Sequence, residues 1–240
     1  MPQAKKKTNK KRNKKQRKSF AEYFQRETLI LSAVAAVAIL FWDSPIVYPV
    51  KLLVVALHEI SHALATIFTG GSVVGMNVDS GLYGEVNSEG GSEFLIASAG
   101  YLGSLLWGFL IFISADNKKF NLILSTFLSV VLLLFVANFF TDPISILILL
   151  AYVVFFYAAP RYLPRKINYW AMRIIGLLSA FYVVFDIKED LLTSEYLATD
   201  ADRLAMITSV PAIYWGLFWF AVSLVVIFLM FKKSYFEKLF

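Results

Sequence analysis

Residues 54–65 read Val54-Val55-Ala56-Leu57-His58-Glu59-Ile60-Ser61-His62-Ala63-Leu64-Ala65, an apolar run interrupted by three ionisable side chains. Side chains four residues apart lie on the same face of an α-helix. In a helix, the imidazoles of His58 and His62 would therefore converge on one point, with Glu59 beside the first of them. Two histidines at this spacing, with a glutamate after the first, are typical of the zinc site of a hydrolase.

Chance is a poor explanation for this motif, because the chain contains only two histidines. Two histidines placed at random fall four apart and are followed by glutamate in about one sequence in 3,000. Ionisable side chains also cost roughly 2.5–3.5 kcal/mol each at the centre of a membrane. Three of them within five residues require a compensating partner. We expect Zn²⁺ in that role, with Glu59 as the base that takes a proton from water.

The composition around this run indicates a membrane protein. Apolar residues make up 58% of the 240 residues and charged residues 17%, against roughly 45–50% and 25% in soluble proteins. Several apolar segments approach the roughly 20 residues that a helix needs to span the bilayer. They lie at about residues 28–42, 46–69, 94–115, 120–140, 143–159, 168–187 and 211–231.

These segments predict an all-α polytopic membrane protein, a bundle of six or seven transmembrane segments. Residues 72–88 alternate Val, Met and Tyr with Gly-rich turns, which predicts a small surface β-hairpin. Small residues four apart, Ala99 with Gly103 and Ser104 with Gly108, favour close approach of another helix. Trp215 and Trp219 are expected to anchor the last segment at the membrane interface.

The positive charge of the chain is concentrated at its start. Ten of the 23 Lys and Arg lie between Lys5 and Lys18, a stretch without Asp or Glu. We predict a basic, disordered cytoplasmic arm over residues 1–27 and a membrane-embedded domain over 28–240. The arm is suited to contact anionic lipid of the bilayer, and no nucleic-acid partner is expected.

The charges of the loops bear on how often the chain crosses the membrane. The loops at 117–119, 161–166 and 232–233 are basic. They share one side of the membrane if six crossings begin with the segment at 46–69. The basic arm joins them only if residues 28–42 do not fully cross, so we favour a re-entrant or interfacial segment there.

Two histidines leave a tetrahedral zinc ion short of one protein ligand, since water takes the fourth place. The chain has no cysteine, so the third ligand must be a carboxylate. Asp186 follows an apolar run near the end of the segment at 168–187, and Asp190 lies one turn later on the same face. We predict Asp186 as the ligand, with Asp190 as the alternative. Residues 199–202 are interpreted as the N-cap of a helix.

The chain resembles a known family in three stretches. These are the helix from Ala56 to Ala65, the Gly-rich stretch after it, and Ala97-Ser98-Ala99-Gly100-Tyr101-Leu102-Gly103. These residues look like the site-2 protease family of intramembrane zinc metallopeptidases, in its small branch without PDZ domains. The later pattern also resembles that branch, at Asp186 to Asp190, Thr199 to Asp202, Ser209 to Ala212 and Trp215 to Trp219. One difference is Ile187-Lys188 after Asp186, where better-known members have an Asp-Gly pair.

The resemblance implies an intramembrane zinc metallopeptidase that cleaves membrane-anchored proteins. It implies that His58, His62 and Asp186 bind the metal and that Glu59 is the catalytic base. A substrate helix must unwind before it is cut, and we expect the strand at 73–78 to receive the unwound segment. The alternatives are a catalytically inactive zinc-binding membrane protein, a metal transporter, or a scaffold that acts through its basic arm.

Overall fold

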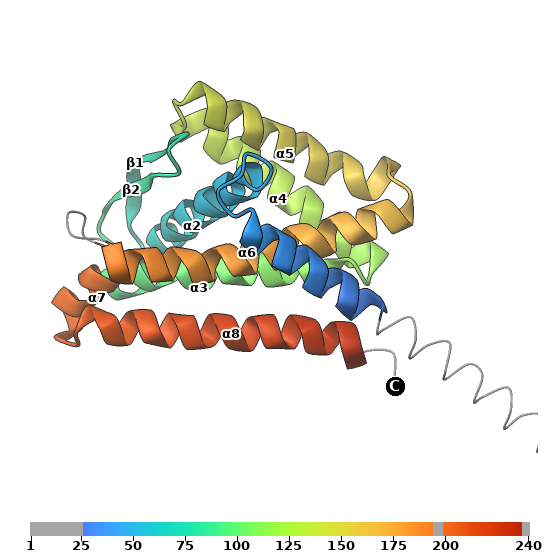
Figure 1. Ribbon diagram of the computed structural model, residues 1–240. Helices are drawn as coiled ribbons and strands as arrows, with labels where there is room; N and C mark the ends of the chain where they lie inside the picture. The colour runs from blue at the N-terminus through green and yellow to red at the C-terminus, as the bar shows by residue number, and fades with distance from the viewer. Residues whose placement is uncertain (1–25, 194–198, 237–240) are drawn as a thin grey trace, which may run out of the picture.

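The computed structural model describes residues 26–193 and 199–236, without the side chains of 189–193 and 233–236. Most of the predicted basic arm lies outside this range. A helix over residues 26–40 comes first. The elements after it are α2 (Tyr48–Phe68), β1 (Ser72–Val78), β2 (Gly84–Glu89), α3 (Glu93–Ser114), α4 (Lys118–Phe139), α5 (Pro143–Tyr162), α6 (Arg165–Thr193), α7 (Asp200–Thr208) and α8 (Ala212–Phe236), drawn in Figure 1.

Six of the described helices are long and apolar enough to span a membrane. They are α2, α3, α4, α5, residues 165–188 of α6 and residues 212–232 of α8. The predicted all-α bundle with a small β-hairpin is therefore confirmed. The described helix of residues 26–40 is not among the six.

Two helices begin at the polar breaks that the sequence contains. The side chain of Asn117 accepts a hydrogen bond from the backbone N–H of Phe120 (3.0 Å) at the start of α4. Asp142 accepts one from the N–H of Ser145 (2.8 Å), and Pro143 opens α5. Such caps satisfy backbone donors that have no partner inside the helix. Proline is tolerated in the first turn because its missing N–H would have had no partner there.

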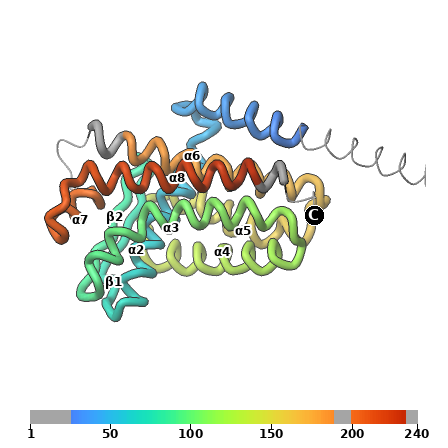
Figure 2. Tube along the Cα trace, turned by 90° about the horizontal axis from the view of Figure 1, so that it is seen from below, coloured from blue at the N-terminus to red at the C-terminus, as the bar shows by residue number. Residues whose placement is uncertain are grey.

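Small residues bring the neighbours of α3 close to it in the middle of the bundle (Figure 2). A Cβ added to Gly103 would overlap Ser61 of α2. One added to Gly108 would lie 3.1 Å from the backbone oxygen of Gly176 in α6. The predicted role of these two glycines in helix packing is confirmed.

The expectation that Trp219 is an interface anchor is wrong. Its side chain is 2% exposed and packs at a tilt on Tyr101 of α3, with ring centroids 4.7 Å apart. A large aromatic ring gains more from burial against another ring than from a place at the bundle surface.

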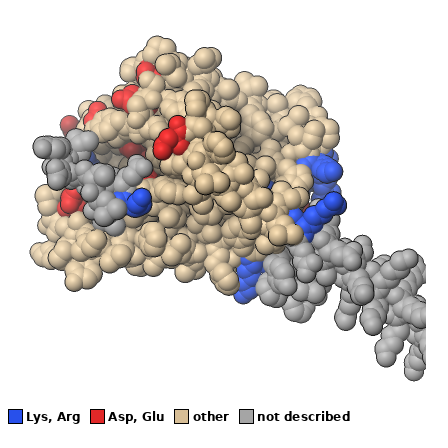
Figure 3. Space-filling view, viewed as in Figure 1, with Lys and Arg blue, Asp and Glu red and all other residues tan. Residues whose placement is uncertain are grey.

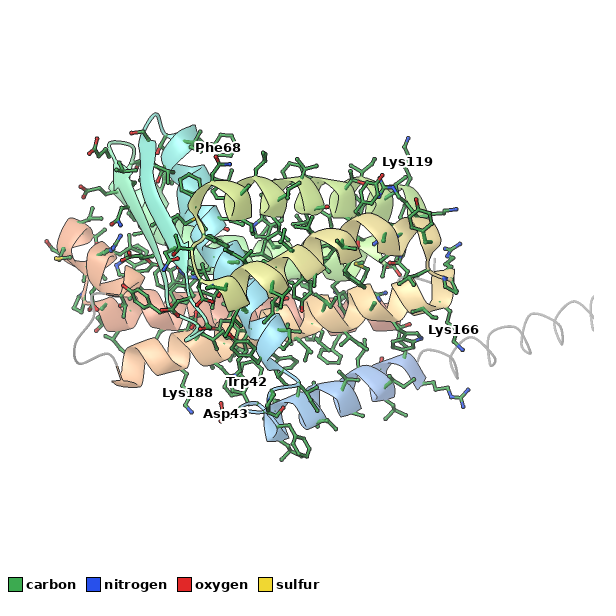
Figure 4. The ribbon with its side chains drawn as sticks, turned by 90° about the horizontal axis from the view of Figure 1, so that it is seen from above. Trp42, Asp43, Phe68, Lys119, Lys166 and Lys188 are labelled. Carbon is green, nitrogen blue, oxygen red and sulfur yellow. The ribbon has the colours of Figure 1, made fainter. Side chains whose placement is uncertain are left out.

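The predicted hairpin is present, with β1 and β2 antiparallel and an irregularity between Val73 and Gly75. It lies along α2, since β1 begins soon after α2 ends and the hydroxyl of Tyr48 donates to the backbone oxygen of Ser80 (2.8 Å). Figure 4 shows α2 and the hairpin running across the direction of α4, α5 and α6 at one end of the bundle. The hairpin thus covers α2 at the end where α7 also lies.

The helix of residues 26–40 is held against α6 by a buried ion pair. Arg173 is 2% exposed and lies 3.3 Å from Glu27 and 2.8 Å from Asp116. After the helix, Trp42 packs on Tyr182 and Phe185 of α6. A buried charge needs partners of this kind, since an unpaired one is costly.

Charge is distributed unevenly between the two ends of the molecule. Figure 3 shows most acidic side chains at the end with the hairpin and α7, and most basic ones at the other end. Figure 4 places Lys119 and Lys166 at the same end of the bundle. The basic loops that contain them therefore share one side, as six crossings require.

Candidate metal centre

His58 and His62 lie on the face of α2 that contacts α3. Their ring centroids are 4.7 Å apart. His62 is 7% exposed, and the edge of the His58 ring packs on Tyr101 of α3, with centroids 4.9 Å apart. The one-turn spacing therefore brings both imidazoles to the same buried point, as the sequence predicted.

The carboxylate that meets the two imidazoles belongs to Asp200, the first residue of α7. Its Oδ2 lies 3.1 Å from His58 Nε2 and 3.0 Å from His62 Nε2. One ligand atom from each of the three residues lies within 4.8 Å of the others. Burial by itself raises the pKa of Asp200, but the neighbouring His62 and His58 outweigh it and hold that pKa below its ordinary range.

The N-cap of α7 leaves the Asp200 carboxylate available to the histidines. The hydroxyl of Thr199 accepts from the N–H of Asp202, and the Asp202 side chain accepts from the N–H of Thr199. The predicted N-cap is thus confirmed, and its acidic member is Asp202. A cap of this kind fixes the direction in which the chain enters the helix.

The donor set fits a small divalent cation such as zinc. His62 Nδ1 lies 2.7 Å from the backbone oxygen of Ile96. Because a carbonyl oxygen can only accept, Nδ1 carries a proton, so Nε2 is the nitrogen that can give its lone pair to a metal, as in a metal-ligating histidine. A Cβ added to Gly100 of α3 would overlap Nε2 of both histidines, so this glycine keeps side-chain atoms away from the point where they converge.

Glu59 reaches the same cavity as these three side chains. The cavity has a volume of about 380 Å³, and its lining includes His58, His62, Asp200 and Glu59. Glu59 is 6% exposed and packs against Gly84 of β2, where an added Cβ would lie 2.6 Å from its Oε1. A carboxylate beside the candidate ligands is thus placed to exchange protons with a molecule bound there.

Asp186, the predicted third ligand, lines this cavity but is not part of the three-residue cluster. It is close enough for its charge to act on His58. The side chain of Asp190 lies outside the described residues. Asp200 was missed because the stretch from Thr199 to Asp202 was interpreted only as a helix start. The cap uses one carboxylate, that of Asp202. The presence of a second acidic residue in the stretch, Asp200, was the signal that it has another role.

The strand beside the cavity is β2, whereas the sequence interpretation assigned that role to residues 73–78 of β1. The described lining includes residues 84–87 of β2 and no residue of β1. The second strand of the hairpin, which leads into α3, is therefore the one that faces the histidines.

Comparison with known proteins shows the family of the chain. The family model described as Peptidase M50B-like matches residues 30–230. No curated protein and no solved structure matches the chain. The matched range contains α2, the hairpin and α7, and therefore every residue of the candidate metal centre. The chain belongs to the Peptidase M50B-like family, a site-2 protease family of membrane metallopeptidases.

Proposed function

We propose that this protein is an intramembrane zinc endopeptidase that hydrolyses peptide bonds of membrane-anchored proteins. One observation carries the proposal: His58, His62 and Asp200 converge within 4.8 Å, beside Glu59 in one cavity. The family match supports the class of reaction. The six apolar helices support a substrate that lies in or near the membrane.

His58, His62 and Asp200 would hold the metal, so Asp200 takes the role that was predicted for Asp186. When bound, zinc supplies a Lewis acid that polarises a peptide carbonyl and makes water more acidic. The backbone oxygen of Ile96 holds the His62 ring in the orientation that this requires. Asp186 adds negative charge near His58.

Glu59 would act as the general base and then as the general acid. Its carboxylate takes a proton from the attacking water and returns it to the leaving amine. Gly84 allows this close approach of β2, because any larger residue would meet the carboxylate. Packing against β2 thus limits the positions that the Glu59 side chain can take.

A helical substrate must unwind before Glu59 can act, and the free edge of β2 is suited to hold the unwound segment. The backbone N–H of Asp79 donates to the oxygen of Tyr83, so these two residues form a hydrogen-bonded pair. Pairs alternate in an antiparallel hairpin. Gly84 and Val86 are therefore non-hydrogen-bonded positions whose backbone groups point away from β1. Both line the cavity, where strand addition can occur.

This use of β2 predicts different effects for two matched prolines. Val86→Pro removes an N–H at the free edge and should lower the cleavage rate about tenfold, since one main-chain hydrogen bond to substrate is lost. Met76→Pro is the control: Met76 pairs with Val86, is similarly buried and does not line the cavity. Zinc content is measured alongside cleavage. Equal cleavage by the two variants would show that the free edge of β2 does not hold the substrate.

The proposed activity is tested with purified protein in lipid nanodiscs and a fluorescent single-span substrate. Chelation of the metal should abolish cleavage, and stoichiometric zinc should restore it. A protein that binds zinc but never cuts would instead be an inactive relative. Zinc uptake into sealed vesicles without cleavage would identify a transporter.

A further inference from the structure

Arg203 lies beside the candidate ligand Asp200 on α7. The two residues are three apart, so they share one side of the helix. Arg203 is exposed, and its side chain forms no hydrogen bond or ion pair with any residue that the structure describes. Its positive charge nevertheless reaches Glu59 and Tyr83. The guanidinium group is thus near the catalytic carboxylate and has its donors available.

Arg203 also stands at the boundary between two cavities. A second cavity of about 560 Å³ adjoins the one that contains the histidines, and both are lined by Arg203 and Ile96. The rest of its lining is small or apolar apart from one acid, and comprises Ser88, Gly90, Gly91, Glu93, Ala97, Met206 and Ile207. Ile96 is the residue whose carbonyl holds His62. The shared wall is therefore next to the candidate metal ligands.

The second strand of the hairpin connects the two cavities. Residues 84–87 of β2 line the first cavity, whereas Ser88 of β2 and the glycines that follow the strand, Gly90 and Gly91, line the second. A peptide extended along β2 would pass the histidines in the first cavity and then Arg203 before it entered the second.

The charged side chains that line the two cavities suit Arg203 to select an acidic substrate side chain. Apart from the histidines, the other ionisable lining residues with charge at neutral pH are acidic: Glu59, Glu85, Glu93, Asp186 and Asp200. These groups repel an acidic substrate side chain, and apart from the histidines and the metal that they would hold, Arg203 is the lining residue that attracts it. Guanidinium also matches a carboxylate with two parallel hydrogen bonds.

We propose that the second cavity is a substrate subsite and that Arg203 selects an Asp or Glu side chain where the peptide enters it. This inference rests on the proposed peptidase function, because a substrate subsite requires a peptide substrate. Arg203 is a specificity-determining residue, and Glu59 remains the group that moves the proton. The substrate class is thus a membrane-anchored protein with an acidic residue close to the scissile bond.

Peptide binding tests the inference without catalysis. The Glu59→Gln protein, loaded with zinc in nanodiscs, is titrated with fluorescent twelve-residue peptides of Ala, Leu and Ser. Each peptide carries one Glu at a different position and has a twin with Gln there. Glu at one or two adjacent positions should tighten binding about two- to fivefold over its twin, as a partly exposed ion pair does.

Two substitutions and a control complete the experiment. Arg203→Gln should remove the preference for Glu, and Arg203→Glu should reverse it in favour of Lys. Lys119→Glu makes the same charge change at the opposite end of the bundle, where Lys119 is exposed, and should leave the preference intact. An unselective native site, or a preference that survives Arg203→Gln, would overturn the proposal. Equal weakening of Glu and Gln peptides by Arg203→Gln would also overturn the proposal. That result would indicate that Arg203 binds the main chain of the peptide and not its acidic side chain.

Cleavage by the native protein separates this inference from the proposed function. Mass spectrometry of digested peptides should place the preferred Glu at a fixed distance from the cut bond. If the peptides are bound selectively but never cut, the peptidase proposal fails while the acidic subsite stands. If they are cut without regard to Glu, the peptidase stands and the role of Arg203 is refuted.

Discussion

Replacement of Asp200 by alanine should lower the zinc affinity of the purified protein at least about 100-fold, whereas Asp186→Ala should retain the metal. Loss of a residue that only supports a ligand costs roughly 10- to 100-fold in metal affinity, and loss of a ligand should cost more. Asp200 Oδ2 meets both imidazoles at 3.0–3.1 Å. Competition with a fluorescent chelator measures the affinity, and elemental analysis measures the stoichiometry.

Asp186 is the matched control for this prediction, because its carboxylate lines the same cavity but lies outside the cluster. Each variant is also compared by thermal unfolding with its metal removed. This comparison separates loss of a ligand from loss of the α7 fold. Zinc release by Asp186→Ala together with retention by Asp200→Ala would restore the ligand that the sequence suggested first.

Glu59→Gln should lower the rate of hydrolysis about 10²–10⁴-fold, the usual worth of a positioned acid–base group, while zinc remains bound. The amide has nearly the size of the carboxylate and should fit against Gly84, but it cannot accept the proton. Single-turnover cleavage of a membrane-anchored reporter measures the chemical step. Zinc is measured in the same samples.

Glu89→Gln makes the same chemical change on β2 at a residue that does not line the described cavities. This control should cleave at the native rate. Substantial hydrolysis by Glu59→Gln would mean that another group moves the proton. Loss of zinc from that variant would mean that Glu59 is a ligand and that the assignment of roles is wrong.

The parts of the fold that were predictable depend on local sequence. Runs of apolar residues set the six long helices, and polar breaks such as Asn117 and Asp142 set where helices begin. The helical spacing of His58 and His62 fixed half of the candidate site without any tertiary information. The hairpin was also visible, because short strands and Gly-rich turns are adjacent in the chain.

The third candidate ligand, a carboxylate, could not be chosen from local sequence patterns. Asp200 is 138 residues beyond His62 in the sequence. Its position beside the histidines therefore depends on how α6 packs on α3 and where α7 begins. Asp186 also reaches the cavity, and only tertiary structure separates the two. The burial of Trp219 was missed for the same reason, since its partner Tyr101 belongs to a distant helix. The buried pair of Glu27 and Arg173 likewise joins residues far apart in sequence.

The most direct measurement of the central claim is X-ray absorption at the zinc edge of the purified protein. We predict two imidazole nitrogens at roughly 2.0–2.1 Å together with oxygen ligands, and loss of one oxygen contribution in Asp200→Ala. Absorption that shows no imidazole ligation, or one imidazole only, would contradict a metal centre built on the paired histidines of α2.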